Sequence, residues 1–292
     1  MNDMPAAEKT AAAQAPAPGG FRVETRDAGV LVVTLCRPAR LNALTQAMKR
    51  DLIELMTAAQ MDDAVRVVVF TGEGKAFCSG DDLGGYSNDK PASVPAISGG
   101  HGTPIGTAQA LRIYSQALNL AVRNLDKITI AAINGPAIQT GLSLALSCDF
   151  RIGSSQARLG SATLRFALLP DEGGHALLVQ HLGLAGALDF MLRKRIVGAQ
   201  EALALGLLTE VTTPEDLMPR TLALAGEMAN GPQVAMRMLK RSIYNAAESS
   251  FVQALDDIAV RTAVTDHHPP ATAPAPSPKS GSRASTPGSR RP

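Results

Sequence analysis

An alternation of strand and helix patterns near the start of the chain most constrains its fold. Val30–Leu35 is a run of apolar, mostly β-branched residues that stops before Pro38, and proline cannot donate a backbone hydrogen bond to a sheet. A helical period of apolar residues begins near Thr45, and Val67–Phe70 is a second short strand pattern. Strand, helix and strand in this order predict two parallel strands joined by a right-handed crossover.

The rest of the chain predicts one more strand, at Thr129–Ile133, followed by helices. We expect a helix from about Thr140, and then five helical stretches: Asp171–His181, Ala199–Leu205, Pro214–Met228, Pro232–Ala247 and Phe251–Val264. This order predicts an α/β core with a C-terminal helical region. The stretch Gly84–Gly106 is rich in Gly, Ser and Pro, and a loop of that length inside a domain is usually functional or mobile.

Both ends of the chain differ in composition from the middle. Residues 1–20 are rich in Ala and Pro and lack the basic start and apolar stretch of a secretory signal, so we expect a flexible leader. After Thr265 the chain becomes rich in Pro, Ser and Arg, which predicts a disordered basic tail at 266–292. The expected folded parts are a core at 21–197 and a helical region at 198–265.

Charge and cysteine content narrow the classes of function. The formal net charge is +2, but the final 26 residues hold four basic residues and no acid, which leaves 24 basic and 26 acidic residues elsewhere. A nearly neutral body gives no electrostatic reason to expect a nucleic acid or an anionic membrane as a partner. No run approaches the roughly 18 apolar residues of a membrane helix. The three cysteines are widely spaced, which favours reduced thiols in a cytoplasmic protein and no metal site.

Two glycine-containing stretches are the strongest candidates for chemistry. They are Gly74-Lys75-Ala76-Phe77-Cys78-Ser79-Gly80-Asp81-Asp82-Leu83 and Ile133-Asn134-Gly135-Pro136-Ala137-Ile138-Gln139-Thr140-Gly141-Leu142. Each follows a predicted strand, and the second opens a predicted helix, whose first N–H groups have no partner within the helix. Two such donors, one from each stretch, would suit a developing thioester oxyanion.

The chain resembles the crotonase (enoyl-CoA hydratase/isomerase) superfamily over about residues 21–265. Besides the two stretches above, the resemblance rests on these landmarks: Arg37-Pro38, Leu41-Asn42-Ala43-Leu44, Arg66-Val67-Val68-Val69, Cys148-Asp149, Leu169-Pro170-Asp171, Gly173-Gly174 and Gly206-Leu207. It implies a spiral of ββα repeats forming two sheets, with C-terminal helices. It also implies an acyl-CoA thioester substrate, no metal or redox cofactor, and a homotrimer or hexamer.

The resemblance also implies roles for single residues. The oxyanion donors would be the backbone N–H groups of Asp81 and Thr140, and we expect the Asp81 carboxylate to point away from the oxyanion. The family's triple glycine reads Gln139-Thr140-Gly141 here, so the side chains of Gln139 and Thr140 would narrow the pocket, while Gly141 is expected to contact the substrate. Asp82, Leu83 and Gly84 are expected to line the CoA thiol arm through backbone groups. Arg40 is either a contact to the CoA phosphates or an ordinary surface arginine.

The acids of the family's hydratases are missing. Their two glutamates correspond to Ser143 and Thr163, whose hydroxyls do not have a pKa suited to acid-base catalysis near neutral pH. Asp171, followed by Glu172, occupies the position of the working aspartate in several isomerases and dehalogenases of the family. The absence of Trp disfavours a dehalogenase, so we predict an isomerase with Asp171 or Glu172 as acid and base. The alternatives are a hydratase with non-standard residues, a non-catalytic acyl-CoA-binding homologue, and Asp171 as a mere helix cap.

Overall fold

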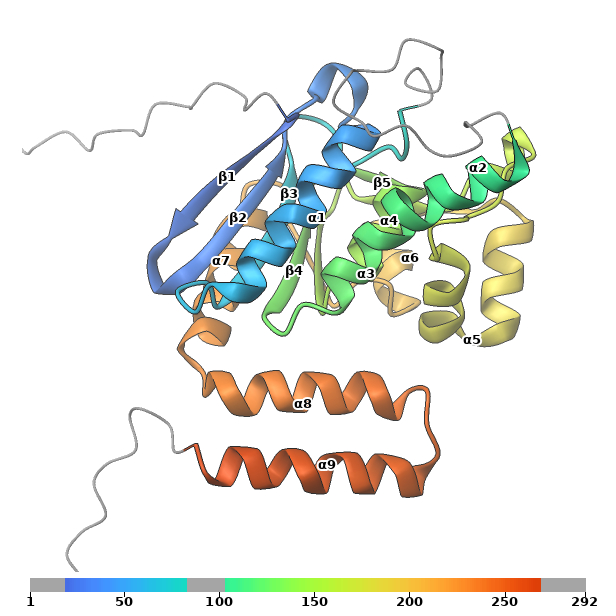
Figure 1. Ribbon diagram of the computed structural model, residues 1–292. Helices are drawn as coiled ribbons and strands as arrows, with labels where there is room; N and C mark the ends of the chain where they lie inside the picture. The colour runs from blue at the N-terminus through green and yellow to red at the C-terminus, as the bar shows by residue number, and fades with distance from the viewer. Residues whose placement is uncertain (1–18, 83–102, 269–292) are drawn as a thin grey trace, which may run out of the picture.

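A computed structural model describes residues 19–82 and 103–268 of the chain (Figure 1). The predicted leader up to residue 18, the predicted tail from residue 269, and two of the predicted CoA-arm residues, Leu83 and Gly84, lie outside the described residues.

Two β-sheets organise the core. The larger has the strand order β1-β2-β3-β4-β6-β9, with β1 antiparallel to β2 and the other pairs parallel. Its strands are β1 (Phe21–Arg26), β2 (Val30–Leu35), β3 (Val67–Gly72), β4 (Ile128–Ile133), β6 (Phe150–Ser154) and β9 (Glu210–Thr212). The smaller has the order β5-β7-β8 and consists of β5 (Pro136–Ile138), β7 (Arg158–Gly160) and β8 (Ile196–Gly198).

The predicted strand, helix, strand unit is present. β2 and β3 are parallel, with Val30 opposite Val67, and α1 (Gln46–Met61) crosses between them. The Thr45 side chain caps α1 by accepting a hydrogen bond from the Met48 N–H. Leu52 and Met56 on the buried face of α1 pack into the core, where each buried side chain contributes roughly 1.5–3 kcal/mol.

Helices cover both faces of the larger sheet (Figure 1). One long rod consists of α2 (Pro104–Ala110), a π-helical segment (Leu111–Gln116) and α3 (Ala117–Arg123), and it packs against α1. π-Helical turns are rare and occur frequently at functional sites. The other helices of the core are α4 (Thr140–Leu146), α5 (Gly174–Leu192), α6 (Ala199–Ala204) and α7 (Leu217–Asn230). α4 is buried along its whole length, and α7 packs against β3 and β4.

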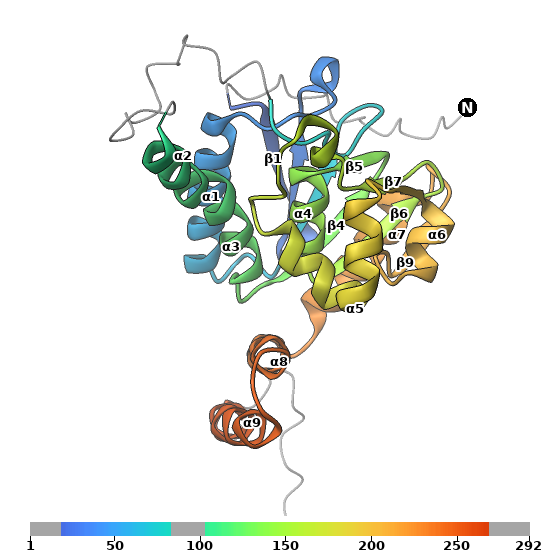
Figure 2. The ribbon, with the colours of Figure 1, turned by 90° about the vertical axis from the view of Figure 1, so that its right-hand side faces the viewer.

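The chain beyond residue 197 is not all helical, in contrast to the prediction from sequence. β9 extends the larger sheet, and α7 belongs to the core. Only α8 (Gln233–Ala246) and α9 (Phe251–Asp266) stand apart, as a hairpin beside the body of the protein (Figure 2). The strand β9 was not predicted from the sequence because its three residues are too few for an alternating apolar pattern to show.

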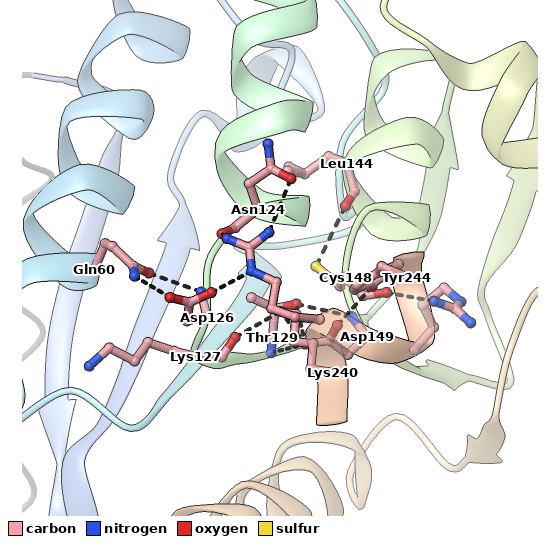
Figure 3. A network of polar contacts seen from close by, with 12 residues as sticks. Gln60, Asn124, Asp126, Lys127, Thr129, Leu144, Cys148, Asp149, Lys240 and Tyr244 are labelled. Carbon is pink, nitrogen blue, oxygen red and sulfur yellow. Dashed lines mark hydrogen bonds and ion pairs between the residues drawn. The ribbon is translucent and has the colours of Figure 1, made fainter. Parts of the chain in front are cut away.

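The hairpin is joined to the core by a buried charged cluster (Figure 3). Lys240 of α8 donates to Asp149 Oδ2 at 2.8 Å and to the Lys127 carbonyl at 2.9 Å. The Tyr244 hydroxyl donates to Asp149 Oδ1 at 2.8 Å, and the Thr129 N–H donates to Asp149 Oδ2 at 2.7 Å. Burial lowers the pKa of Lys240, while the Asp149 carboxylate opposes that shift.

One helix, α5, is long and apolar enough by length and composition to cross a membrane, and it is the one such helix in the described part of the chain. From the sequence we expected no such run. The backbone of α5 breaks at Gly183, where φ is 67° and ψ is 172°. Because a spanning segment must satisfy its backbone hydrogen bonds internally, this break disfavours a membrane role.

Candidate active site

A cavity of about 420 Å³ lies where α1, the π-helical segment, the start of α4 and the segment before α5 meet. Its wall includes Asp81 and Thr140, one from each glycine-containing stretch, together with Asp171. The fold therefore brings together three of the residues proposed from sequence. The wall also contains Lys49, which the sequence analysis did not single out.

The two glycine-containing stretches touch each other directly. The Ile138 N–H donates to the Cys78 carbonyl at 2.9 Å, and Cys78 forms a parallel bridge with Ala137. A Cβ atom on Gly141 would lie 2.2 Å from the Cys78 carbonyl oxygen, so only glycine fits this contact. Gly141 is buried and does not line the cavity among the described residues, so its visible role is to hold the stretches together.

The entry to α4 is strained where the family has its first glycine. Gln139 has φ 53° and ψ −116°, a conformation that costs a non-glycine residue about 1–3 kcal/mol. Its side-chain amide donates to both carboxylate oxygens of Glu172, at 3.0 and 3.2 Å, which offsets part of that cost. Thr140 follows as the first residue of α4, where an N–H group has no acceptor within the helix.

The Asp81 carboxylate is bound by two side chains from other parts of the chain. Its expected direction, away from the oxyanion, stays a prediction. Asp81 lines the cavity, and its Oδ1 accepts a hydrogen bond of 2.7 Å from Thr140 Oγ1. Its Oδ2 accepts at 2.8 Å from Lys49 Nζ, which also donates to Ser115 Oγ at 2.7 Å. The buried ammonium group supplies the charge that lets Asp81 remain inside. Lys49 lies three residues before Leu52 on the apolar face of α1, and this unusual position was the available signal in the sequence.

Asp171 and Glu172 lie in different surroundings. Asp171 lines the cavity and is exposed as a whole residue, but its carboxyl is partly withdrawn from water. This partial desolvation, followed by the negative charge of Asp81, raises the pKa of Asp171. Glu172 is buried and accepts a hydrogen bond of 2.6 Å from Ser143 Oγ. Burial raises the pKa of Glu172 to about 7, against the opposing effect of the Ser143 hydrogen bond.

The segment that carries these two acids is fixed by the neighbouring helix rod. Gln116 Nε2 donates to the Asp171 carbonyl at 2.9 Å, and Asn119 Nδ2 donates to the Glu172 carbonyl at 2.9 Å. α5 begins only at Gly174, with Gly173 in the N-cap position. The alternative in which Asp171 caps this helix is therefore wrong.

Asp82 and Arg40, two of the residues expected near CoA, do not line the cavity in the described part of the chain. The Asp82 carboxylate forms an ion pair of 2.7 Å with Arg37, which also donates to the Ala43 carbonyl at 2.6 Å. Arg40 is exposed and does not line the cavity in the described part of the chain. The CoA contacts of Arg40 and Asp82 stay predictions.

Thiol and metal chemistry have little support at this site. Complete burial raises the pKa of Cys78 to about 12, so its thiol stays protonated and acts as core packing. Over residues 19–82 and 103–268, no group of three or more His, Cys, Asp or Glu side chains is arranged to hold a metal ion.

Comparison with known proteins defines the class to which this fold and site belong. The sequence profile of the enoyl-CoA hydratase/isomerase family matches residues 25–267, and the chain belongs to that family. Solved structures agree: a crystal structure of a putative enoyl-CoA hydratase from Thermobifida fusca YX, in complex with CoA, superposes with a TM-score of 0.77. That protein is 32% identical, and the match covers 85% of this chain and 93% of the other. The predicted α/β crotonase fold is thereby confirmed.

Relatives within the family differ in the reaction their names describe. A probable enoyl-CoA hydratase of Mycobacterium leprae (strain TN) is 33% identical over 76% of this chain and 73% of its own length. The 1,2-epoxyphenylacetyl-CoA isomerase of Escherichia coli (strain K12) is 29% identical over 78% of this chain and 83% of its own length. The family thus defines an acyl-CoA enzyme, and the reaction has to be argued from the residues of the cavity.

Proposed function

We propose that this enzyme shifts a double bond in an acyl-CoA thioester through an enolate intermediate. The thioester oxygen would sit between the backbone N–H groups of Asp81 and Thr140, which both line the cavity. Direct contact between these two residues, through Thr140 Oγ1 and Asp81 Oδ1, supports the prediction that both donors face one oxygen. Asp82, Leu83, Gly84 and Arg40 would hold the CoA part of the substrate.

Asp171 is proposed as the acid and base. It would take a proton from C2 of a 3-enoyl thioester, which leaves the electron pair in the enolate, and would return the proton at C4 to give the 2-enoyl product. A raised pKa suits this exchange because it makes the carboxylate a stronger base. The observation that carries the proposal is the position of Asp171 in the same cavity wall as both proposed donors.

A CoA-ester panel followed by mass detection tests this function. We expect conversion of 3-enoyl to 2-enoyl thioesters, with exchange of C2 protons for deuterium in heavy water. Hydration of crotonyl-CoA, visible as a gain of one water in mass, would instead support a hydratase. Binding of CoA esters without any turnover or exchange would support a non-catalytic homologue.

The hydratase alternative is favoured by one specific observation. The Glu172 carboxylate lies 2.6 Å from the hydroxyl of Ser143, the position of a hydratase glutamate in the family. A carboxyl group therefore lies near one of the two places where hydratases carry their acids. We rank Glu172 below Asp171 because its carboxylate is buried and accepts hydrogen bonds from Gln139 and Ser143.

Assembly and location are proposals carried over from the sequence. A homotrimer or hexamer is supported by apolar side chains that are exposed on α5 and on the α8–α9 hairpin, since monomers rarely expose large apolar patches. They include Leu184, Leu188, Leu192, Leu239, Ile243, Phe251 and Val252.

A cytoplasmic location is supported by three buried free cysteines.

A further inference from the structure

A buried ion pair in the cavity wall has no part in the chemistry proposed so far. Lys49 Nζ and Asp81 Oδ2 are 2.8 Å apart, and the two side chains are only 2% and 16% exposed. The Lys49 ammonium is held from a second side by Ser115 of the π-helical segment. The Asp81 carboxylate is thus joined to α1 directly and to the π-helical segment through Lys49.

A lone aspartate in this place would oppose the proposed reaction. The enolate carries a negative charge, and a carboxylate on the residue that supplies one donor N–H would repel it, more strongly in a site that excludes water. The same carboxylate nevertheless links the two donor residues, because Asp81 Oδ1 accepts from Thr140 Oγ1 at 2.7 Å. Asp81 can hold the donors together only if its charge is cancelled.

We propose that Lys49 is a positioning and charge-balancing residue of the oxyanion site. Its ammonium cancels the charge of Asp81 and fixes the carboxylate against Thr140, so that both backbone N–H groups face one oxygen. This inference rests on the proposed oxyanion site, but not on which reaction follows the enolate. Lys49 acts through Asp81 and exchanges no proton with the substrate.

Acetoacetyl-CoA provides a test that needs no turnover. It loses its C2 proton to solvent to form an enolate with a near-ultraviolet absorption band, so titration of the bound ligand gives its apparent pKa. In Lys49→Met, loss of the ammonium beside the Asp81 carboxylate should raise this pKa by about one unit or more, a tenfold loss in the enolate-to-keto ratio. The double variant Lys49→Met/Asp81→Asn removes both charges and should return the ratio to within about threefold of the wild type.

The Lys240–Asp149 pair supplies a matched control. Its two charged groups are also 2.8 Å apart, and the side chains are similarly buried, with 4% and 11% exposed (Figure 3). This pair joins α8 to the core and lines a different cavity. Lys240→Met should lower thermal stability much as Lys49→Met does, yet leave the apparent pKa of bound acetoacetyl-CoA unchanged. A merely structural role for Lys49 would give the two variants the same pattern.

Each outcome decides the point. Two results would overturn the inference while leaving the proposed function intact. One is an unchanged apparent pKa of the bound ligand in Lys49→Met, and the other is an enolate-to-keto ratio in the double variant that is as low as in Lys49→Met. If Lys49→Met does not fold, Asp81→Asn replaces it: there the unopposed ammonium should raise the enolate-to-keto ratio by about threefold or more, and an unchanged ratio overturns the inference. Absence of any enolate band with the wild-type protein would overturn the oxyanion site itself, and the inference with it.

Discussion

Ser143 Oγ donates a hydrogen bond of 2.6 Å to Oε1 of Glu172. Neither residue lines the proposed active-site cavity in the described part of the chain, and the Gln139 amide donates to both oxygens of the same carboxylate. The Glu172 carboxylate thus lies beside Ser143 of α4, the position that corresponds to a glutamate in the family's hydratases. The relationship explains why Asp171 and Glu172, though adjacent in sequence, call for separate tests.

Asp171→Asn tests the proposed acid and base. We expect kcat to fall by about 100-fold or more with a modest change in KM, because the amide cannot accept a proton. Thermal stability should persist, since the N-cap of α5 is Gly173 and not Asp171. Asp256→Asn, an exposed change on α9, is the control. Full activity in the Asp171 variant would exclude the role.

Glu172 should make stability depend on pH. Its pKa is raised from 4.5 to about 7 by burial, so the folded state favours the neutral carboxyl. The corresponding stabilisation is present below about pH 4.5 and is lost as pH rises through 7, on the order of 3 kcal/mol.

Glu172→Gln should remove this part of the pH dependence of the free energy of unfolding, measured by urea titration between pH 4.5 and 7. Glu215→Gln, on an exposed glutamate, should keep the wild-type slope. If both variants follow the wild type, Glu172 does not titrate in this range.

Gly141→Ala should disrupt the contact between the two glycine-containing stretches. The new Cβ would lie 2.2 Å from the Cys78 carbonyl oxygen, and such overpacking costs roughly 1–3 kcal/mol or more. A lower Tm and weaker CoA-ester binding are expected. Gly226→Ala in α7 is a matched control, because no atom lies within 4 Å of its added Cβ, and it should raise stability by about 0.5–1 kcal/mol. Equal effects of the two changes would contradict this prediction.

Lys240→Met should loosen the α8–α9 hairpin from the core. Removing the ammonium leaves the Asp149 carboxylate buried and uncompensated, which typically costs about 3–5 kcal/mol. Hydrogen exchange should accelerate in α8 and α9 before it does so in the larger sheet, because the hairpin packs beside the core and not within it. Uniform acceleration across the chain would show that the hairpin does not open separately. Tyr244→Phe, which keeps the ion pair, should cost only about 1 kcal/mol.

Local sequence patterns were enough to predict the parts of this protein that depend on neighbouring residues. β2 has the predicted bounds, Val30–Leu35, and α1 begins directly after its predicted start at Thr45. Both follow from local apolar patterns and from a side-chain cap that needs only residues a few positions apart. The two glycine-containing stretches were also recognisable, because their order after predicted strands is a local property.

The surroundings of the reacting groups depend on contacts between segments that are far apart in the sequence. Lys49 meets Asp81 and Ser115, which lie 32 and 66 positions further along the chain, and Glu172 meets Ser143 across 29 positions. No periodic pattern encodes such pairs, because they form where separate helices and turns pack together. Burial at those junctions then sets the charge balance of the cavity, and this is why the partners of the Asp81 carboxylate could not be predicted from its own segment.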